Sequence, residues 1–337
     1  MTRKNRLLSA VALSATLAIT AAACSSDDSS SESSADGQEM LEVNFGYIPD
    51  FNGASLLAVA ESEGYWEAHG VDVNTQVFTN GPLQIQALGT GDLDFGNIGP
   101  GAFWLPASGQ AQLVAMNALG QNDRVVAQPG INSMDDLRGK TVAVPVGTSG
   151  DMILTLALED AGMAKDDIEL VPMEPSAIVA AMSSGQVDAA GFWYPALATV
   201  SEQVPDMVEL AQNSDFEDTV AFPNAFVAGN DVVADDPEMT DRVLGALRDA
   251  MEFRAANMEE TIQLTADYTN QPVEAVTEDS GMVRALSAEE VDELTEDGSV
   301  ESWLNGMQDY FVEAEKIDEK VDPNSFYAGD LFIQAGE

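Results

Sequence analysis

The chain has 337 residues, of which 58 are acidic and 13 are lysine or arginine, so its formal net charge is −45 at pH 7. A chain this negative is a poor partner for nucleic acid or for an anionic lipid surface, because both carry charge of the same sign. Its single cysteine excludes a disulfide within the chain. The length is sufficient for two hydrophobic cores rather than one.

The N-terminus predicts a secretory signal. Three basic residues lie within positions 3–6, an apolar stretch follows over 7–19, and three alanines at 21–23 precede Cys24. This order is typical of exported proteins, and the apolar stretch is too short to span a membrane as a mature helix. An ordinary signal peptide with a cysteine at the cut is the alternative. We predict a signal peptide over residues 1–23 and acylation of Cys24, which cleavage would leave as the first residue.

Residues 24–39 predict a flexible tether. The segment is rich in serine and acidic residues and has almost no apolar side chains, so it cannot form a core. Like charges along such a segment keep it extended. We therefore expect a disordered linker between a lipid anchor, on the extracytoplasmic face of the cell membrane, and a folded part that begins near residue 40.

Strand and helix patterns alternate along the folded part. Residues 41–47 and 71–78 alternate apolar and polar side chains and predict strands. This rhythm indicates an α/β fold with largely parallel sheets, and the length indicates two lobes. The other expected elements are helices over 54–60 and 80–88, a strand over 141–146, a helix over 151–161, a strand over 168–172, a helix from Ser176, and mainly helical structure from Asp235 on.

Four expected helices begin directly after strands, in loops where ligands of open α/β sheets bind. Helix N-termini offer unpaired N–H groups and partial positive charge, so they could hold an anion without an arginine. Plain capping by the same residue types is the alternative, and we favour it at Pro175-Ser176. The starts that we assign to ligand binding are Gly81-Pro82, Gly99-Pro100 and Thr148-Ser149-Gly150.

Aromatic and charged residues fall in the same loops. Tyr47 and Phe51 follow the first expected strand, and Trp193 ends an apolar strand before Pro195, where an indole could wall a ligand site. We expect Phe103 to fill the core. Asp50 is included among the predicted ligand contacts. Whether Asp50, Asp123, Asp151 or Arg124 contacts a ligand directly is left open, because Arg124 could equally pair with Asp123.

Three strings carry a family resemblance: GDLDFGNIG at 91–99, MDDLRGKTVAVP at 134–145 and GQVDAAGFWYP at 185–195. In this order they resemble the solute-binding proteins of bacterial ABC importers for taurine, alkanesulfonates and nitrate, a group that includes pyrimidine-precursor binders. The likeness runs from residue 43 to the C-terminus and is greatest for taurine-type members.

The resemblance implies a two-lobed, periplasmic-binding-protein-like (type II) fold. Lobe 1 would comprise residues 40–124 and 226–337, and lobe 2 residues 125–225. The ligand would lie in the cleft between them and the lobes would close over it. A permease and its ATPase would be the partners. The same resemblance favours ligand contact at Thr148-Ser149-Gly150.

Taurine-type members place an acid where this chain has Asn224, just before the second crossing between lobes. The family resemblance, not this replacement, implies a small anion or zwitterion of the sulfonate or taurine type as the ligand. Asn224 is a predicted contact that lacks the charge of the acid it replaces. The alternatives are a pyrimidine precursor, an amine or a quaternary ammonium compound, or a sensory lipoprotein of the same fold that takes no part in transport.

Nothing in the sequence predicts an enzyme. The sole histidine, His69, lies at an expected helix end, and the sole cysteine lies at the signal cut. The chain shows no glycine-rich phosphate loop, no metal-ligand spacing and no nucleophile elbow. We predict no catalytic residue, no cofactor and no metal.

Overall fold

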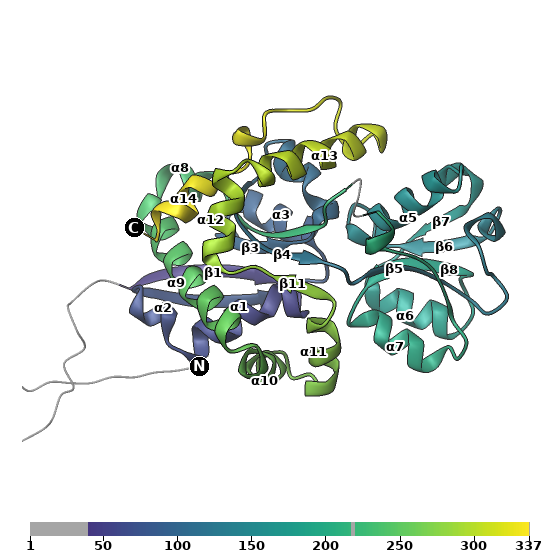
Figure 1. The fold of residues 1–337 in the computed structure, drawn as a ribbon, viewed down its shortest axis with the longest axis horizontal. Helices are drawn as coiled ribbons and strands as arrows, with labels where there is room; N and C mark the ends of the chain where they lie inside the picture. The colour runs from purple at the N-terminus through teal and green to yellow at the C-terminus, as the bar shows by residue number, and fades with distance from the viewer. Residues whose placement is uncertain (1–39, 217–219, 337) are drawn as a thin grey trace, which may run out of the picture. The chain divides into compact units, whose positions relative to one another are not determined.

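The computed structural model describes residues 40–216 and 220–336 (Figure 1). The predicted signal peptide, the predicted acylation site Cys24 and the predicted linker at 24–39 lie outside the described residues. The chain from residue 40 on forms one compact unit, which is described by itself below. In these described residues no helix is both long enough and apolar enough to cross a membrane.

The first sheet has six strands in the order β11-β4-β10-β3-β1-β2. β1 runs parallel to β2 and β3, whereas β10 is antiparallel to β3 and β4. Phe45 of β1 stacks on Phe95 of β3 and meets Phe226 of β10 edge-on, each with ring centres 5.9 Å apart. The core of the first lobe therefore packs against the centre of this sheet. The strands are β1 Leu41–Tyr47, β2 Val71–Val77, β3 Phe95–Ile98, β4 Gln112–Gly120, β10 Pro223–Ala228 and β11 Val283–Ala285.

The second sheet has five strands in the order β7-β6-β8-β5-β9. β6 is parallel to β7 and β8, while β5 is antiparallel to β8 and β9. The expected parallel pairing thus holds within each strand–helix run, but β5 and β10 run antiparallel because the chain reaches them from the other lobe rather than through a crossover helix. The strands are β5 Asp123–Ala127, β6 Thr141–Val144, β7 Glu169–Pro172, β8 Ala189–Trp193 and β9 Val208–Gln212.

Helices cover both sheets, as an α/β fold requires, and the predicted two-lobed α/β class is confirmed. The longest, α9, buries Val243, Leu244, Leu247 and Met251 on the face indicated by their spacing. In the first lobe the helices are α1 Phe51–Ser62, α2 Tyr65–Ala68, α3 Gly81–Thr90, η1 Pro100–Ala102, α4 Trp104–Ala107, α8 Asn230–Asp235, α9 Pro237–Ala256, α10 Met258–Thr269, α11 Val273–Ser280, α12 Ala288–Glu296, α13 Ser299–Glu313, η5 Pro323–Ser325 and α14 Gly329–Gln334. In the second lobe they are η2 Met134–Leu137, α5 Ser149–Asp160, η3 Lys165–Asp167, α6 Pro175–Ser183, α7 Ala196–Gln203 and η4 Asn213–Asp215.

The chain passes between the sheets twice. It leaves the first sheet at Gly120 and joins the second at Asp123, then leaves the second at Gln212 and rejoins the first at Pro223. Figure 1 shows β4 leading into β5 between the two lobes. The second sheet thus already includes Asp123 and Arg124, whereas the first crossing was expected after residue 124. The first sheet includes all of β10 from Pro223 on, whereas the second crossing was expected after residue 225. Each boundary lies two or three residues before the expected one.

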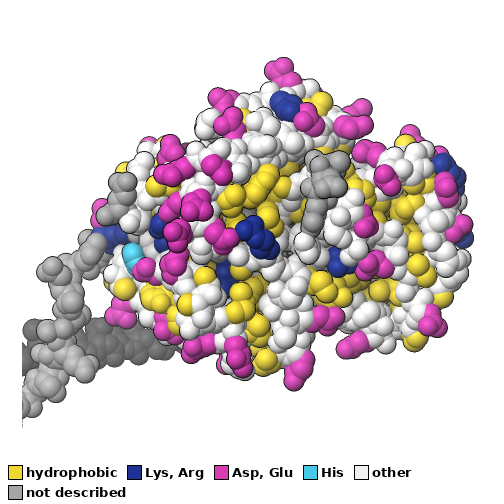
Figure 2. All heavy atoms as spheres, viewed as in Figure 1, with side chains coloured by type: hydrophobic (Ala, Val, Ile, Leu, Met, Phe, Trp, Pro, Cys, Tyr) yellow, Lys and Arg dark blue, Asp and Glu magenta, His cyan; other side chains and the backbone are white. Residues whose placement is uncertain are grey.

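Acidic side chains are spread over the face shown in Figure 2, with few basic side chains among them. Ten lysine and arginine residues follow Cys24, and all ten are described. Nine of them form ion pairs with acidic side chains. The tenth, Arg254, is fully buried and donates to Ser55, Asn117 and the Leu286 carbonyl instead. The basic residues are therefore already engaged within the fold.

Candidate functional site

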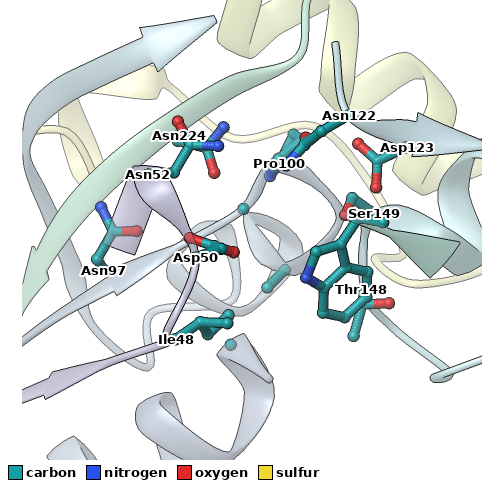
Figure 3. Close-up of a pocket in the computed structure, with 14 residues that line it drawn as sticks. Ile48, Asp50, Asn52, Asn97, Pro100, Asn122, Asp123, Thr148, Ser149 and Asn224 are labelled. Atoms are coloured by element: carbon teal, nitrogen blue, oxygen red, sulfur yellow. The ribbon is translucent and has the colours of Figure 1, made fainter. Parts of the chain in front are cut away.

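A cavity lies where loops of the two lobes meet, and we call it the central cavity (Figure 3). The space open to the centre of a water molecule measures about 30 Å³. This is room for about two water molecules, so the cavity as it stands fits only a very small group. The lining residues are Ile48, Asp50, Asn52, Gly81, Asn97, Gly99, Pro100, Ala102, Asn122, Asp123, Thr148, Ser149, Trp193 and Asn224.

Strand ends and helix starts build the central cavity. Asp50 follows β1, Gly99 follows β3 and Thr148 follows β6, so the cavity lies outside the carboxyl ends of parallel strands in both sheets. The helices α1, α3 and α5 begin at its wall, together with the short η1. Several helix N-termini thus contribute partial positive charge to one small space.

Most of the predicted ligand contacts line the central cavity. They come from both lobes, as a site between lobes requires. Those that line it are Asp50, Gly81, Gly99, Pro100, Thr148, Ser149, Trp193 and Asn224; those that the structure places outside its lining are Tyr47, Phe51, Pro82 and Gly150.

The four predicted residues outside the lining have other partners. Tyr47 packs on Tyr268 of α10 with ring centres 5.5 Å apart, and Phe51 packs in a small core with Ala266 and Val276. A Cβ on Gly150 would lie 2.5 Å from the Gly191 carbonyl oxygen, so this glycine lets α5 approach β8. Pro82 lies beside Gly147: a Cβ built on Gly147 would be 3.9 Å from the proline ring.

Thr148 and Ser149 start α5 at the cavity wall, but their hydroxyls differ. The Thr148 hydroxyl donates to the Pro145 carbonyl at 2.6 Å, so it holds the loop together. Ser149 lies near Asp123; burial raises the pKa of that carboxyl, and the Ser149 side chain acts against this rise. Of the two hydroxyls, the one of Ser149 lies near a carboxyl that lines the cavity, Asp123.

The two lobes touch backbone to backbone beside Ser149. A Cβ built on Gly101 would lie 2.1 Å from the Thr148 carbonyl carbon and 2.3 Å from the Ser149 nitrogen. No side chain fits at that distance, so this contact depends on glycine at position 101. It places the start of α5 directly against η1 of the first lobe.

Three buried carboxyls surround the cavity. Burial raises the pKa of Asp50 well above its usual range, and the nearby Asp279 raises it further, although Asp50 accepts from the Gly53 N–H at 2.7 Å as the cap of α1. Burial also raises the pKa of Asp123, against the effects of Ser149, of the hydrogen bond from Asn213 and of the positive charge of Arg124. Behind the lining, burial raises the pKa of Asp279 to about 6, although it accepts from the Phe51 N–H at 2.7 Å.

Asp151 and Arg124, whose roles the sequence left open, do not line the cavity. Burial would raise the pKa of Asp151, but Lys165, the Gly147 N–H and Lys316 outweigh it and hold the pKa below its usual value. Arg124 pairs with Glu209 at 2.9 Å and donates to backbone carbonyls, one of them its neighbour's. Both residues serve the loops around the cavity.

Sequence reasoning missed five lining residues. Asn97 carried a signal, since it lies within the first family string. Asn52 lies two residues after the predicted contact Asp50, in the first turn of the same helix, and both residues line the cavity. Ile48, Ala102 and Asn122 carried no signal that separates them from ordinary loop residues. In residues 40–216 and 220–336 no group of three or more histidine, cysteine, aspartate or glutamate side chains is placed to hold a metal ion.

The fold and its cavity define a class, that of two-lobed solute-binding proteins. A solved structure titled as the alkanesulfonate-binding protein SsuA from Xanthomonas axonopodis pv. citri bound to MOPS superposes with a TM-score of 0.66. The match covers 86% of this chain and 99% of that one at 21% sequence identity. At that identity the likeness concerns the fold.

Sequence comparison gives the family. Residues 52–261 match the family described as NMT1/THI5 like, and the chain belongs to it. A putative binding protein of Brucella abortus is 50% identical over 292 residues, which cover 87% of this chain and 92% of that protein. The taurine-binding periplasmic protein of Escherichia coli is 32% identical over 131 residues, 38% of this chain and 41% of its own length. These matches confirm the family resemblance, and the two relatives are binding proteins, not enzymes.

Proposed function

We propose that this chain is the extracytoplasmic receptor of an ABC importer, anchored by lipid at Cys24, and that it captures a small sulfonate-like or taurine-like anion or zwitterion. The observation that carries the proposal is the central cavity, a small space walled by both lobes at the ends of their strands. The names of the Xanthomonas and Escherichia relatives support the ligand class. The loaded receptor would dock on a permease driven by an ATPase.

The helix starts support an anion at this place. No lysine, arginine or histidine is among the described residues that line the cavity. Gly81 at the start of α3 and Ser149 at the start of α5 instead bring N–H groups and the positive ends of two helices of 10 and 12 residues. A sulfonate or carboxylate would be held by these dipoles.

Contacts between the lobes support capture by closure. Thr79 and Asn80 of the first lobe both donate to the Glu174 carboxylate of the second, at 2.8 and 2.9 Å. Lys316 of the first lobe donates to Asp151 of the second at 3.3 Å. Such pairs are available when the lobes meet, and they would add to the ligand's own contacts in favouring the closed state.

Ligand binding is expected to change the fluorescence of Trp193. Its side chain lines the cavity and is 7% exposed, so a bound solute and the closing of the lobes should alter the environment of the indole. Titration of the purified chain with taurine, followed by tryptophan emission and by calorimetry, tests this. Trp193→Phe should remove the spectral response, whereas Trp303→Phe, on α13 and outside the cavity lining, should keep it. A full response in Trp193→Phe would place the ligand elsewhere.

Cys24→Ala is expected to abolish lipid attachment. Without its acylated cysteine the exported chain has nothing to hold it in the bilayer, so the protein should leave the membrane fraction while its affinity for taurine stays unchanged. Fractionation of cells and mass spectrometry of the N-terminal peptide test the anchor. Wild-type protein recovered without lipid would contradict it.

A further inference from the structure

The central cavity contains hydrogen-bond acceptors that the protein does not use. Among the described residues, Asp123 Oδ1 and Asn52 Oδ1 are buried and have no hydrogen-bond partner. The two side chains are 2% and 3% exposed, and both line the cavity, Asn52 from the first lobe and Asp123 from the second. A buried polar atom without a partner costs free energy, so a ligand that donates hydrogen bonds to these oxygens would be stabilised.

The two carboxyls that line the cavity also favour a ligand with a positively charged donor group. Asp50 and Asp123 are two buried carboxyls on one small cavity. Burial raises the pKa of Asp50 most, and Asp123 is among the acids that raise it further. All ten basic residues beyond Cys24 are engaged elsewhere in the fold, as described above. Arg124 opposes the rise that burial causes in the pKa of Asp123, but it is paired with Glu209 and does not line the cavity. A cation brought by the ligand would further offset the burial of these carboxylates.

The arrangement of the acceptors indicates which kind of cation fits. Figure 3 shows Asp50 and Asn52 on one side of the lining residues and Asp123 with Ser149 on the other. A protonated primary amine carries three N–H donors, enough for one bond to each of Asp50, Asn52 and Asp123. A quaternary ammonium group has no N–H to donate and is recognised by several aromatic faces, whereas Trp193 is the one aromatic residue among the described lining residues.

We propose that Asp50, Asn52 and Asp123 form a subsite for the protonated primary amine of a zwitterionic ligand. The inference rests on the proposed function and narrows it: the anionic end would meet the starts of α3 and α5, and the cationic end would meet the carboxylates. The two carboxylates come from different lobes, so a bound ammonium would also link the lobes. A ligand without the amine leaves Asp123 Oδ1 and Asn52 Oδ1 without a hydrogen-bond donor and brings no cation to the two carboxylates.

Two matched ligand pairs test the subsite by calorimetry on the full chain. Taurine and ethanesulfonate share the sulfonate and differ in the amine, and β-alanine and propanoate do the same with a carboxylate. The aminated member of each pair should bind about 10- to 100-fold more tightly, as expected for hydrogen bonds to charged groups. The N,N,N-trimethyl derivative of taurine should lose most of that gain, because it has no N–H.

Isosteric variants assign the effect to the two carboxylates. Asp50→Asn keeps a good helix cap for α1, and Asp123→Asn keeps the volume of the side chain. Each should weaken taurine binding about 10- to 100-fold and leave ethanesulfonate binding unchanged or stronger. Asp231→Asn, an exposed position on α8, is the matched control and should bind every ligand as the wild type does.

The outcomes separate the subsite from the proposed function. If ethanesulfonate binds as tightly as taurine and both Asp variants bind taurine normally, the subsite is overturned while the sulfonate receptor stands. Selective binding of β-alanine, lost in Asp123→Asn, without binding of either sulfonate would support the subsite and overturn the sulfonate assignment. Equal affinity for the trimethyl derivative would overturn the primary-amine assignment, and no binding by either pair would overturn both proposals.

Discussion

Replacing Gly101 by alanine is expected to weaken ligand binding roughly 10- to 100-fold, the effect of the 1–3 kcal/mol that overpacking a tight contact costs. The added Cβ would lie 2.1 Å from the Thr148 carbonyl carbon, so η1 and the start of α5 must separate. Contacts from the first lobe and from Ser149 could then no longer be made to the same ligand at their best distances. Calorimetric titration with taurine measures the loss.

Gly89→Ala is the matched control for this variant. Gly89 is exposed on α3, and a Cβ built there has no heavy atom within 4 Å. Alanine in a helix is favoured over glycine by up to about 1 kcal/mol, so this variant should be slightly more stable than the wild type and bind ligand equally well. Wild-type affinity in Gly101→Ala would show that the backbone contact does not hold the binding geometry.

The ligand-free protein is expected to lose stability as the pH rises from 5 to 7.5. The pKa of Asp279 is raised from the usual 3.8 to about 6, so between these values the folded state keeps a proton that the unfolded state has lost. Its contribution to the free energy of unfolding is complete below the unfolded pKa and is lost as the pH rises through 6. The full contribution is about 3 kcal/mol, of which roughly half remains at pH 5. The raised pKa values of Asp50 and Asp123 act in the same direction.

Urea denaturation at several pH values measures this dependence. In Asp279→Asn the part of the slope due to this carboxyl should disappear, since an amide does not titrate over this range but still accepts from the Phe51 N–H. Asp231→Asn should keep the wild-type slope and controls for the loss of one negative charge from a very acidic chain. A slope that is the same in Asp279→Asn and in the wild type would contradict the expected titration.

Local patterns in the sequence predicted the elements that place the cavity. The alternation in 41–47 gave a strand whose end carries Asp50, and the third family string ended at Trp193, which lines the cavity. These predictions succeed because a strand end, the following loop and a helix start are neighbours in the chain as well as in space. Asn224 also lines the cavity, at the second crossing between the lobes.

Contacts between distant segments could not be read in the same way. Tyr47 precedes the same loop as Asp50, but Tyr268, 221 positions later, packs on it. Asp279 reaches the start of α1 from 228 residues away and bonds the Phe51 N–H. The loop positions of Asp50 and Asp123 marked them as candidates, but among 58 acidic residues nothing local distinguishes Asp279 from the solvated ones. Asp279 is buried because α11 packs on the start of α1.

The engagement of all ten basic residues beyond Cys24 within the fold has a consequence for how fast solutes arrive. A molecule with a formal charge of −45 repels a net anion at distances up to the Debye length, about 8 Å at physiological ionic strength. Encounter with a simple sulfonate is thereby slowed at low salt, while a zwitterion, with no net charge, meets no such barrier. The acidic surface thus favours zwitterions kinetically, before any contact with the cavity is made.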